Sequence, residues 1–262
     1  MEPNLVHFGY VVSLDYKNPY LNPYEEFQRL KTHPALRDTF EGGKCISYGA
    51  RALNEGGYFA IPKISVRGGL LVGCAAGFLN VAKIKGTHNA MKSGMVAAES
   101  LYKRYVDEGT IKEVEISEYE ANLKDSEVYK EMYRTRNFKG GFNYTLWGGL
   151  THGFVSSLLK GKEPWNIHYN HKNDAETTGT KDKYKPIEYP KKDGVLTFDL
   201  LENLTRSGTN HNHNQPSHLK IKPGMEDVPL KSYEKHGAPE TRFCPAKVYE
   251  FVSDEKGEVK LQ

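Results

Sequence analysis

The sequence has few cysteines, and their spacing excludes a disulfide framework and a metal site built from cysteine alone. It contains only Cys45, Cys74 and Cys244, and none of them belongs to a Cys-x-x-Cys pair. An odd number of widely spaced cysteines excludes a disulfide framework and favours a reducing compartment. The same spacing excludes a complete metal site built from cysteine alone.

Charge of one sign and long apolar runs are missing as well. The 36 basic and 33 acidic residues give a net charge of +3, so we expect no nucleic-acid partner. The mean hydropathy of -0.65 predicts a soluble or membrane-peripheral protein. No leader peptide is expected, because residues 6–12 already fit a strand. A G-x-G-x-x-G turn, which binds the ADP part of a dinucleotide, is absent.

The most informative segment that is present runs from Gly69 to Leu101. Residues 69–72 predict a buried strand, residues 73–77 a glycine turn, and Gly86 the start of a helix. One face of that helix carries Ala90, Gly94, Ala97, Ala98 and Leu101, all of them small except Leu101. Another backbone could approach this face, and the free N–H groups at Gly86 and Thr87 would face a negatively charged ligand such as a reduced flavin. Ordinary α/β packing is the alternative.

The residues of this unit, Gly73–Val81 and Lys83–His88, resemble the electron-transfer flavoprotein–ubiquinone oxidoreductase family. They are similar to the second flavin-binding motif of that family, with Cys74 where most related flavin monooxygenases have Asp. Further segments resemble the same family in the same order, namely Gly9–Tyr16, Asn18–Leu21, Tyr48–Gly57, Ser207–His211, Arg242–Ala246 and Val248–Phe251. The resemblance covers nearly the whole chain.

The resemblance implies electron transfer from reduced electron-transfer flavoprotein through a [4Fe–4S] cluster and FAD to ubiquinone. Such an enzyme works on a membrane surface, the matrix side of the mitochondrial inner membrane or the bacterial cytoplasmic membrane, and needs no acid–base dyad. The expected fold class is α+β or α/β. An FAD-binding remnant would be interleaved with a quinone-binding sheet-and-helix domain and followed by the start of a ferredoxin-like iron–sulfur domain. The expected boundaries are 1–45 (quinone), 46–110 (FAD), 111–165 (helical, membrane-facing) and 166–262 (iron–sulfur).

The resemblance also implies site residues. The flavin neighbours would be Asn54, Gly73, Cys74, Gly86 and Thr87, and the quinone neighbours Leu14, Tyr16, Phe27 and Leu30. Cys244 matches the first cluster ligand, but a [4Fe–4S] centre needs four thiolates, and Cys45 and Cys74 fall in the expected flavin region. Without the resemblance, Asn54 before Gly56-Gly57 is a turn former, Phe27 is core packing, and Cys244 is a buried thiol.

Residues 142–159 contain no charge and are flanked by Lys139, Lys160 and Lys162. At 100° per residue the large side chains fall on one arc of a helix, and the small residues lie mostly opposite. The large side chains are Tyr144, Leu146, Trp147, Leu150, Phe154, Val155 and Leu158. The segment is too short to span a bilayer, which needs about 20 apolar residues. It predicts a helix in the membrane interface or a buried helix, and the resemblance favours the first, with Trp147, Leu150 and Phe154 in contact with lipid.

Local signals predict the remaining elements. Residues 5–16 and the segment that ends at Asn54 predict strands, and Pro23 predicts a helix that ends before Pro34, with Tyr24, Phe27 and Leu30 on its apolar face. Ser117 and Glu120 predict a capping box for a helix that reaches Arg136. Residues 166–195 predict an extended surface connection. His211, His213 and His218 lie within eight residues, and we interpret them as loop structure rather than as metal ligands.

Members of the family would carry several hundred residues before the first position and three more cluster cysteines after the last. We therefore expect a fragment that binds FAD weakly or not at all and assembles no stable cluster. Two other functions remain open. One is a geranylgeranyl-reductase-like or monooxygenase-like flavoprotein with a nicotinamide donor, which would lack the Cys244 segment. The other is a non-catalytic, membrane-peripheral binding module.

Overall fold

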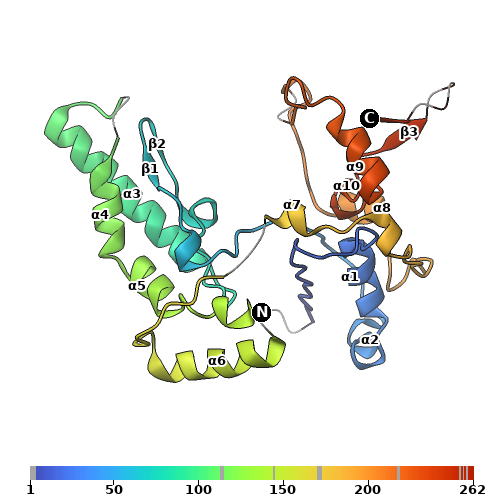
Figure 1. Cartoon of the computed structure of the whole chain (residues 1–262), viewed down its shortest axis with the longest axis horizontal. Coiled ribbons are helices and arrows are strands. Elements are labelled where there is room, and N and C mark those ends of the chain that lie inside the picture. Colours follow the sequence, from blue (N-terminus) through green and yellow to red (C-terminus); the bar gives the residue numbers. More distant parts are fainter. Residues whose placement is uncertain are drawn as a thin grey trace. The chain divides into compact units, whose positions relative to one another are not determined.

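A computed structural model describes residues 4–112, 115–143, 145–169, 173–216, 219–253, 255, 257 and 259–262 (Figure 1). The chain forms two compact units. The terminal unit combines Met1–Arg51 with Lys172–Gln262, and the central unit is Ala52–His171. Each unit consists mainly of helices and contains one small two-stranded antiparallel sheet. The structure is therefore a mixed helical fold with small sheets, as expected at that coarse level.

The terminal unit brings together residues from both ends of the sequence. Its helices are α1 (Pro23–Lys31), α2 (Pro34–Phe40), α7 (Asp174–Thr177), η4 (Lys181–Lys183), α8 (Leu200–Thr205), α9 (Val228–His236) and α10 (Glu240–Phe243). Its sheet pairs β3 (Phe251–Ser253) with β4 (Val259–Leu261), with Phe251 opposite Leu261. Tyr233 of α9 stacks on Phe251, so this helix packs on the sheet through an aromatic contact.

Helix α1 begins where the sequence predicts it. The Asn22 side chain accepts hydrogen bonds from the N–H groups of Tyr24 and Glu25, and Pro23 is the first helical residue. The buried side chains are Tyr24, Gln28 and Lys31, so the buried face is rotated from the expected one. The Tyr24 hydroxyl donates to the Phe198 carbonyl at 2.6 Å and ties α1 to the segment before α8.

The strand expected at residues 5–16 is wrong, since the described residues 4–17 form no helix or strand. Aromatic contacts hold this segment instead. The Phe8 ring lies 5.3 Å from the Phe27 ring and 5.0 Å from the Phe40 ring, measured between centroids. A strand needs a neighbouring strand to satisfy its backbone groups, and none of the described strands pairs with these residues. Residues 44–57 likewise form no strand.

The central unit holds the long helix α3 (Thr87–Glu108) together with α4 (Ser117–Lys124), α5 (Glu127–Arg134) and α6 (Leu146–Leu159). Three short turns, η1 (Tyr58–Ala60), η2 (Gly73–Ala76) and η3 (Gly140–Asn143), connect these helices with a hairpin of β1 (Ser65–Val66) and β2 (Gly69–Leu70). One cluster of buried side chains forms its core, namely Ile64, Ala76, Phe78, Val96, Ala97, Ile116, Tyr119, Leu123 and Val128.

Two expectations for the central unit need correction. Residues 69–72 are not a buried strand, because β2 has two residues and both Leu71 and Val72 are exposed. The helix expected over residues 117–136 is two helices, interrupted at Asp125 and Ser126. Ser117 does not cap it, since the helix begins after Ile116 and no side chain accepts its first N–H groups.

Helix α3 begins where the sequence predicts it but buries a different face. It begins after Gly86 and ends at Gly109, whose φ of +70° is the left-handed conformation that favours glycine. The buried residues are Asn89, Ser93, Val96, Ala97 and Ser100. Ala98 is exposed, and a Cβ placed on Gly94 would meet no described atom within 4 Å. The close approach expected at Gly94 is therefore absent. In the described part of the chain, no helix combines the length and apolarity that crossing a bilayer requires.

Candidate functional site

The predicted flavin residues meet at the first turns of α3. The Gly73 N–H donates to the Ser93 hydroxyl at 3.0 Å, and this bond is buried. Gly73 has a φ of +58°, and a Cβ at this position would lie 3.0 Å from the Ala90 Cβ. Only glycine fits both the conformation and the space, so close approach of this turn to α3 is confirmed at Gly73.

Asn54 is bonded to this turn, whereas Thr87 is exposed at the start of α3. The Asn54 side-chain amide donates to the Cys74 carbonyl at 2.9 Å, so it fixes the turn. Thr87 is the first residue of α3 and is exposed, and no side chain caps the helix at Gly86. A Cβ on Gly86 would lie 3.0 Å from the Leu79 side chain. The first N–H groups of α3 therefore remain available to an acceptor beside an exposed hydroxyl.

A polar cluster that sequence reasoning missed holds the same end of α3. The Glu131 carboxylate on α5 accepts hydrogen bonds from the Asn80 amide and from His88 Nε2, the latter at 2.8 Å. Lys83 Nζ lies 4.0 Å from this carboxylate. Burial alone would raise the pKa of Glu131, but the bonds from Asn80 and His88 outweigh it and lower that pKa. Nothing in the sequence pairs residues 80, 88 and 131.

Helix α6 presents its apolar arc outward. Thr145 caps it by accepting from the Gly148 N–H at 2.9 Å. The Trp147 side chain is 75% exposed, Leu150 49% and Phe154 68%. On the opposite face, a Cβ on the buried Gly149 would lie 2.1 Å from the Phe142 ring. The described residues thus leave the large side chains of α6 uncovered and bury Gly149 and Ser156, and contact of this apolar arc with lipid stays a prediction. Tyr144 lies outside the described residues.

A buried arginine fixes the residues that follow α6. The Arg136 guanidinium donates to the carbonyls of Tyr133, Gly161, Glu163 and Trp165 and to the Asn166 side chain, at 2.7 to 3.4 Å. It also lies 3.7 Å from the buried Glu163 carboxylate, which accepts from Ser156 on α6. This cluster sets the position of α6 in the unit.

The four predicted quinone residues lie in the terminal unit with different surroundings. Leu14 is exposed, and Tyr16, Phe27 and Leu30 are half-buried. Burial raises the pKa of Tyr16, and the nearby Arg242 charge opposes this rise. The Phe27 ring packs on Phe8 and, with Leu30, leaves an apolar surface beside α1.

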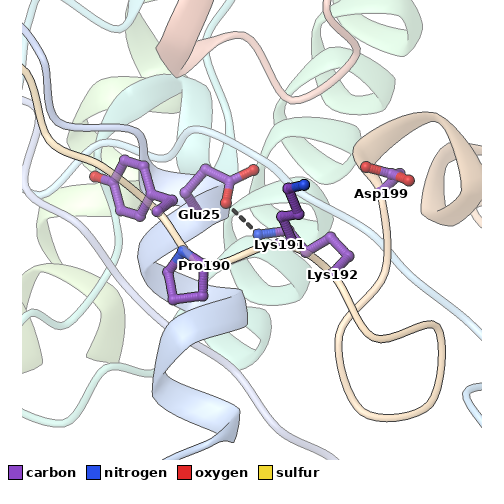
Figure 2. Close-up of a pocket in the computed structure, with 6 residues that line it drawn as sticks. Glu25, Pro190, Lys191, Lys192 and Asp199 are labelled. Carbon is purple, nitrogen blue, oxygen red and sulfur yellow. Dashed lines mark hydrogen bonds and ion pairs between the residues drawn. The ribbon is translucent and has the colours of Figure 1, made fainter.

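A second feature of α1 is an open pocket of about 560 Å³ with a charged lining (Figure 2). Six residues line it, namely Glu25, Tyr189, Pro190, Lys191, Lys192 and Asp199. Glu25 and Lys192 form an ion pair, drawn as a dashed line in Figure 2. The Tyr189 hydroxyl donates to Glu26 at 3.0 Å and accepts from the Asn22 N–H, and burial raises its pKa to about 12. This lining is polar, unlike the surface at Phe27.

Cys244 follows α10 and is buried, and its Sγ accepts from the Val248 N–H at 3.4 Å. Nearby, Arg242 donates to the Gly237 carbonyl at 2.6 Å and lies 5.1 Å from the centroid of the Tyr20 ring. The described residues contain no group of three or more potential metal ligands. A [4Fe–4S] centre needs four thiolates, so Cys244 would supply one of the four.

The other candidate ligands do not complete this site. Cys45 shares the terminal unit with Cys244, and its Sγ lies 3.8 Å from the Asn203 side-chain oxygen. Cys74 is exposed in the central unit. His211 and His213 are exposed, and His218 lies outside the described residues.

Two segments of the chain match models of known protein families. Residues 1–53 match the family model "ETF-QO, ubiquinone-binding". Residues 194–262 match the model "Electron transfer flavoprotein-ubiquinone oxidoreductase, 4Fe-4S". The chain belongs to the electron transfer flavoprotein–ubiquinone oxidoreductase family. The quinone residues fall in the first match and Cys244 in the second, and each residue's role remains a prediction.

Similar members of the family come from several eukaryotes. The chain is 51% identical over 261 residues to the mitochondrial enzyme of Caenorhabditis elegans, covering 98% of this chain and 43% of that protein. It is 48% identical over 276 residues to the probable mitochondrial enzyme of Saccharomyces cerevisiae, covering 97% and 44%. It is 49% identical over 261 residues to the mitochondrial enzyme of Homo sapiens, covering 97% and 42%. The chain thus spans less than half the length of these relatives.

Proposed function

We propose that this chain supplies the quinone-binding, membrane-facing and first cluster-ligand parts of an electron transfer flavoprotein–ubiquinone oxidoreductase. Such an enzyme takes electrons from reduced electron-transfer flavoprotein through a [4Fe–4S] cluster and FAD to ubiquinone. One observation carries the proposal. The segments that match the ubiquinone-binding and 4Fe–4S models, 1–53 and 194–262, lie in one compact unit apart from residues 52–53. A geranylgeranyl-reductase-like flavoprotein would lack the second match.

The membrane part of the proposal rests on α6. Its exposed side chains, Trp147, Leu150 and Phe154, would enter the boundary between lipid headgroups and acyl chains. Lys160 and Lys162 follow the helix and are exposed, so they would meet anionic headgroups. The relatives are named mitochondrial, which supports a mitochondrial location, and the proposal extends this to the matrix side of the inner membrane.

The flavin part rests on the first turns of α3. Gly73 and Gly86 let the turn pack closely on Ala90 and Leu79 beside the start of α3, and Thr87 offers a hydroxyl and an N–H at the free helix terminus. Asn54 and Cys74 support this rim through their mutual hydrogen bond. These residues fit the edge of an isoalloxazine ring, and bound FAD would supply the redox chemistry. The FAD-domain remnant and the ferredoxin-like fold belong to the same proposal.

The experiment is a chimera in which this chain replaces the matching part of the Caenorhabditis elegans relative. We expect the chimera to reduce ubiquinone with electrons from electron-transfer flavoprotein. Replacing Trp147, Leu150 and Phe154 together by Ser should release it from liposomes and slow turnover more with a long-tailed than with a short-tailed quinone. Ser157→Ala, a change at an exposed polar position of α6, is the matched control.

Two outcomes would contradict the proposal. A chimera that folds and binds flavin but does not reduce ubiquinone would remove the quinone-reductase function. Unchanged liposome co-sedimentation after the triple replacement would remove the membrane role of α6, whatever the turnover.

A further inference from the structure

The turn that leads into α3 holds an isoleucine in an unfavourable backbone conformation. Ile84 has a φ of +51°, in the left-handed region, and the residue is 68% exposed. A β-branched residue rarely adopts this conformation, because its side chain collides with the neighbouring backbone. Such a conformation persists only where surrounding contacts hold the chain in it. Burial of the Ile84 side chain offers little compensation, so the contacts that hold the turn must come from its other residues.

Asn80 supplies those contacts. It is 0% exposed, its N–H donates to the Lys85 carbonyl at 2.9 Å, and its carbonyl accepts from the Lys85 N–H at 3.3 Å. Its side-chain oxygen accepts from the Lys83 N–H at 3.2 Å. These three bonds close residues 80–85 into a loop that contains Ile84. The position of the Asn80 side chain therefore helps to determine the shape of the turn.

The Asn80 side chain is in turn held by α5. Its amide donates to the Glu131 carboxylate, which also accepts from His88 Nε2 on α3 at 2.8 Å. Since a carboxylate only accepts, the His88 nitrogen that faces it carries a proton. One carboxylate thus fixes the start of the turn and the first turn of α3. Gly86 and Thr87 lie in sequence between these two points.

We infer that Glu131 is a positioning residue for the flavin-binding end of α3, which it holds through Asn80 on one side and His88 on the other. This inference rests on the proposed function, in which Thr87 and the free N–H groups of α3 meet the flavin. Glu131 acts through its two partners and not by contact with the flavin. Donors that are already fixed lose less conformational entropy when a ligand binds, so these hydrogen bonds should strengthen flavin binding.

The first test needs no flavin and uses hydrogen exchange in the full chain. Glu131→Ala removes the acceptor of both bonds, and the amides of Asn80 and Lys85 should then exchange at least about tenfold faster. Glu131→Gln keeps an oxygen for the Asn80 amide and can donate to His88 in its other tautomer, so it should keep most of the protection. Glu127→Ala, at an exposed position one turn earlier on α5, is the matched control and should leave both amides unchanged.

A double variant tests whether Glu131 holds the unfavourable conformation. Glycine adopts a positive φ without steric cost, so in an Ile84→Gly chain the turn should depend less on its anchors. Glu131→Ala should therefore accelerate exchange of the Lys85 amide at least about threefold less in this background than in the unmodified chain. Equal acceleration in both backgrounds would show that Glu131 does not hold the turn in this conformation, and would overturn the inference.

The flavin-containing chimera measures the consequence for binding. Glu131→Ala should weaken FAD binding at least about tenfold, and Glu131→Gln should restore the affinity to within about threefold of the unmodified chimera. The melting temperature of each variant shows whether the central unit stays folded. If Glu131→Ala does not fold, His88→Ala replaces it, because His88 is exposed and its substitution removes one of the two bonds. That variant should weaken FAD binding about two- to threefold.

The outcomes distinguish this inference from the function on which it rests. Unchanged amide exchange in Glu131→Ala, or an unchanged FAD affinity despite faster exchange, would overturn the inference. The flavin-binding role of Thr87 would then still stand. If the unmodified chimera folds but binds no FAD, that role is wrong and the inference is wrong with it.

Discussion

Replacing Arg136 by Met should destabilise the central unit strongly. The substitution removes five hydrogen bonds to residues on both sides of α6 and leaves the Glu163 carboxylate buried without a positive charge. Breaking a buried ion pair from one side typically costs about 3–5 kcal/mol. We expect the free energy of unfolding to fall by about that amount, and α6 to lose its fixed position.

The double variant Arg136→Met with Glu163→Gln tests the reasoning. Removing both charges together should cost less than the sum of the single changes, with a coupling energy of about 1–3 kcal/mol. The assay is urea unfolding followed by tryptophan fluorescence. Both tryptophans of the sequence, Trp147 and Trp165, lie in the central unit, so the signal reports that unit alone.

A matched control is available on the same segment. Arg134 is exposed, and Arg134→Met should change stability by no more than about 0.5 kcal/mol. Our account would be refuted if Arg136→Met unfolded within about 1 kcal/mol of the unmodified chain, or if the two single changes were additive. Liposome binding of Arg136→Met should also decrease, since α6 would no longer present its apolar arc in one orientation.

Three further predictions concern packing, pH and the flavin rim. Gly149→Ala should destabilise the chain by about 1–3 kcal/mol because an aromatic ring fills the space, whereas Gly94→Ala should stabilise it by about 0.5–1 kcal/mol in thermal unfolding. Hydrogen bonds from the N–H groups of residues 197 and 195 lower the pKa of Asp193. The stability that this carboxylate contributes should therefore be complete above the usual carboxyl pKa of about 4 and disappear as the pH falls further. An Asp193→Ala chain with the same acid-unfolding midpoint as the unmodified chain would contradict this. In the flavin-containing chimera, Thr87→Ala and Asn54→Ala should each lower the flavin potential by roughly 20 mV, and unchanged redox titrations would exclude them from the site.

The sequence alone predicted the elements whose signals are local. Pro23 predicted the start of α1 and Gly86 the start of α3, since residues at a helix terminus act on the neighbouring backbone only. The pattern of residues 142–159 predicted which side chains share one face of α6, because helical periodicity depends on the local sequence, but it left open whether that face is exposed. The short motifs predicted the family, because each motif is a stretch of neighbouring residues that can be compared without the fold.

The tertiary structure decided what depends on distant partners. Residues 5–16 have the composition of a strand, yet they pair with none of the described strands and pack through Phe8 instead. Arg136 meets Asn166 from 30 residues away, and Gln28 accepts from the N–H of a residue 170 positions later. Burial of Gln28 and Lys31 follows from these long-range contacts, since periodicity placed Tyr24, Phe27 and Leu30 inward instead. Local propensity cannot supply such information, because the free energy of burying a polar group is set by which partners the whole fold brings to it.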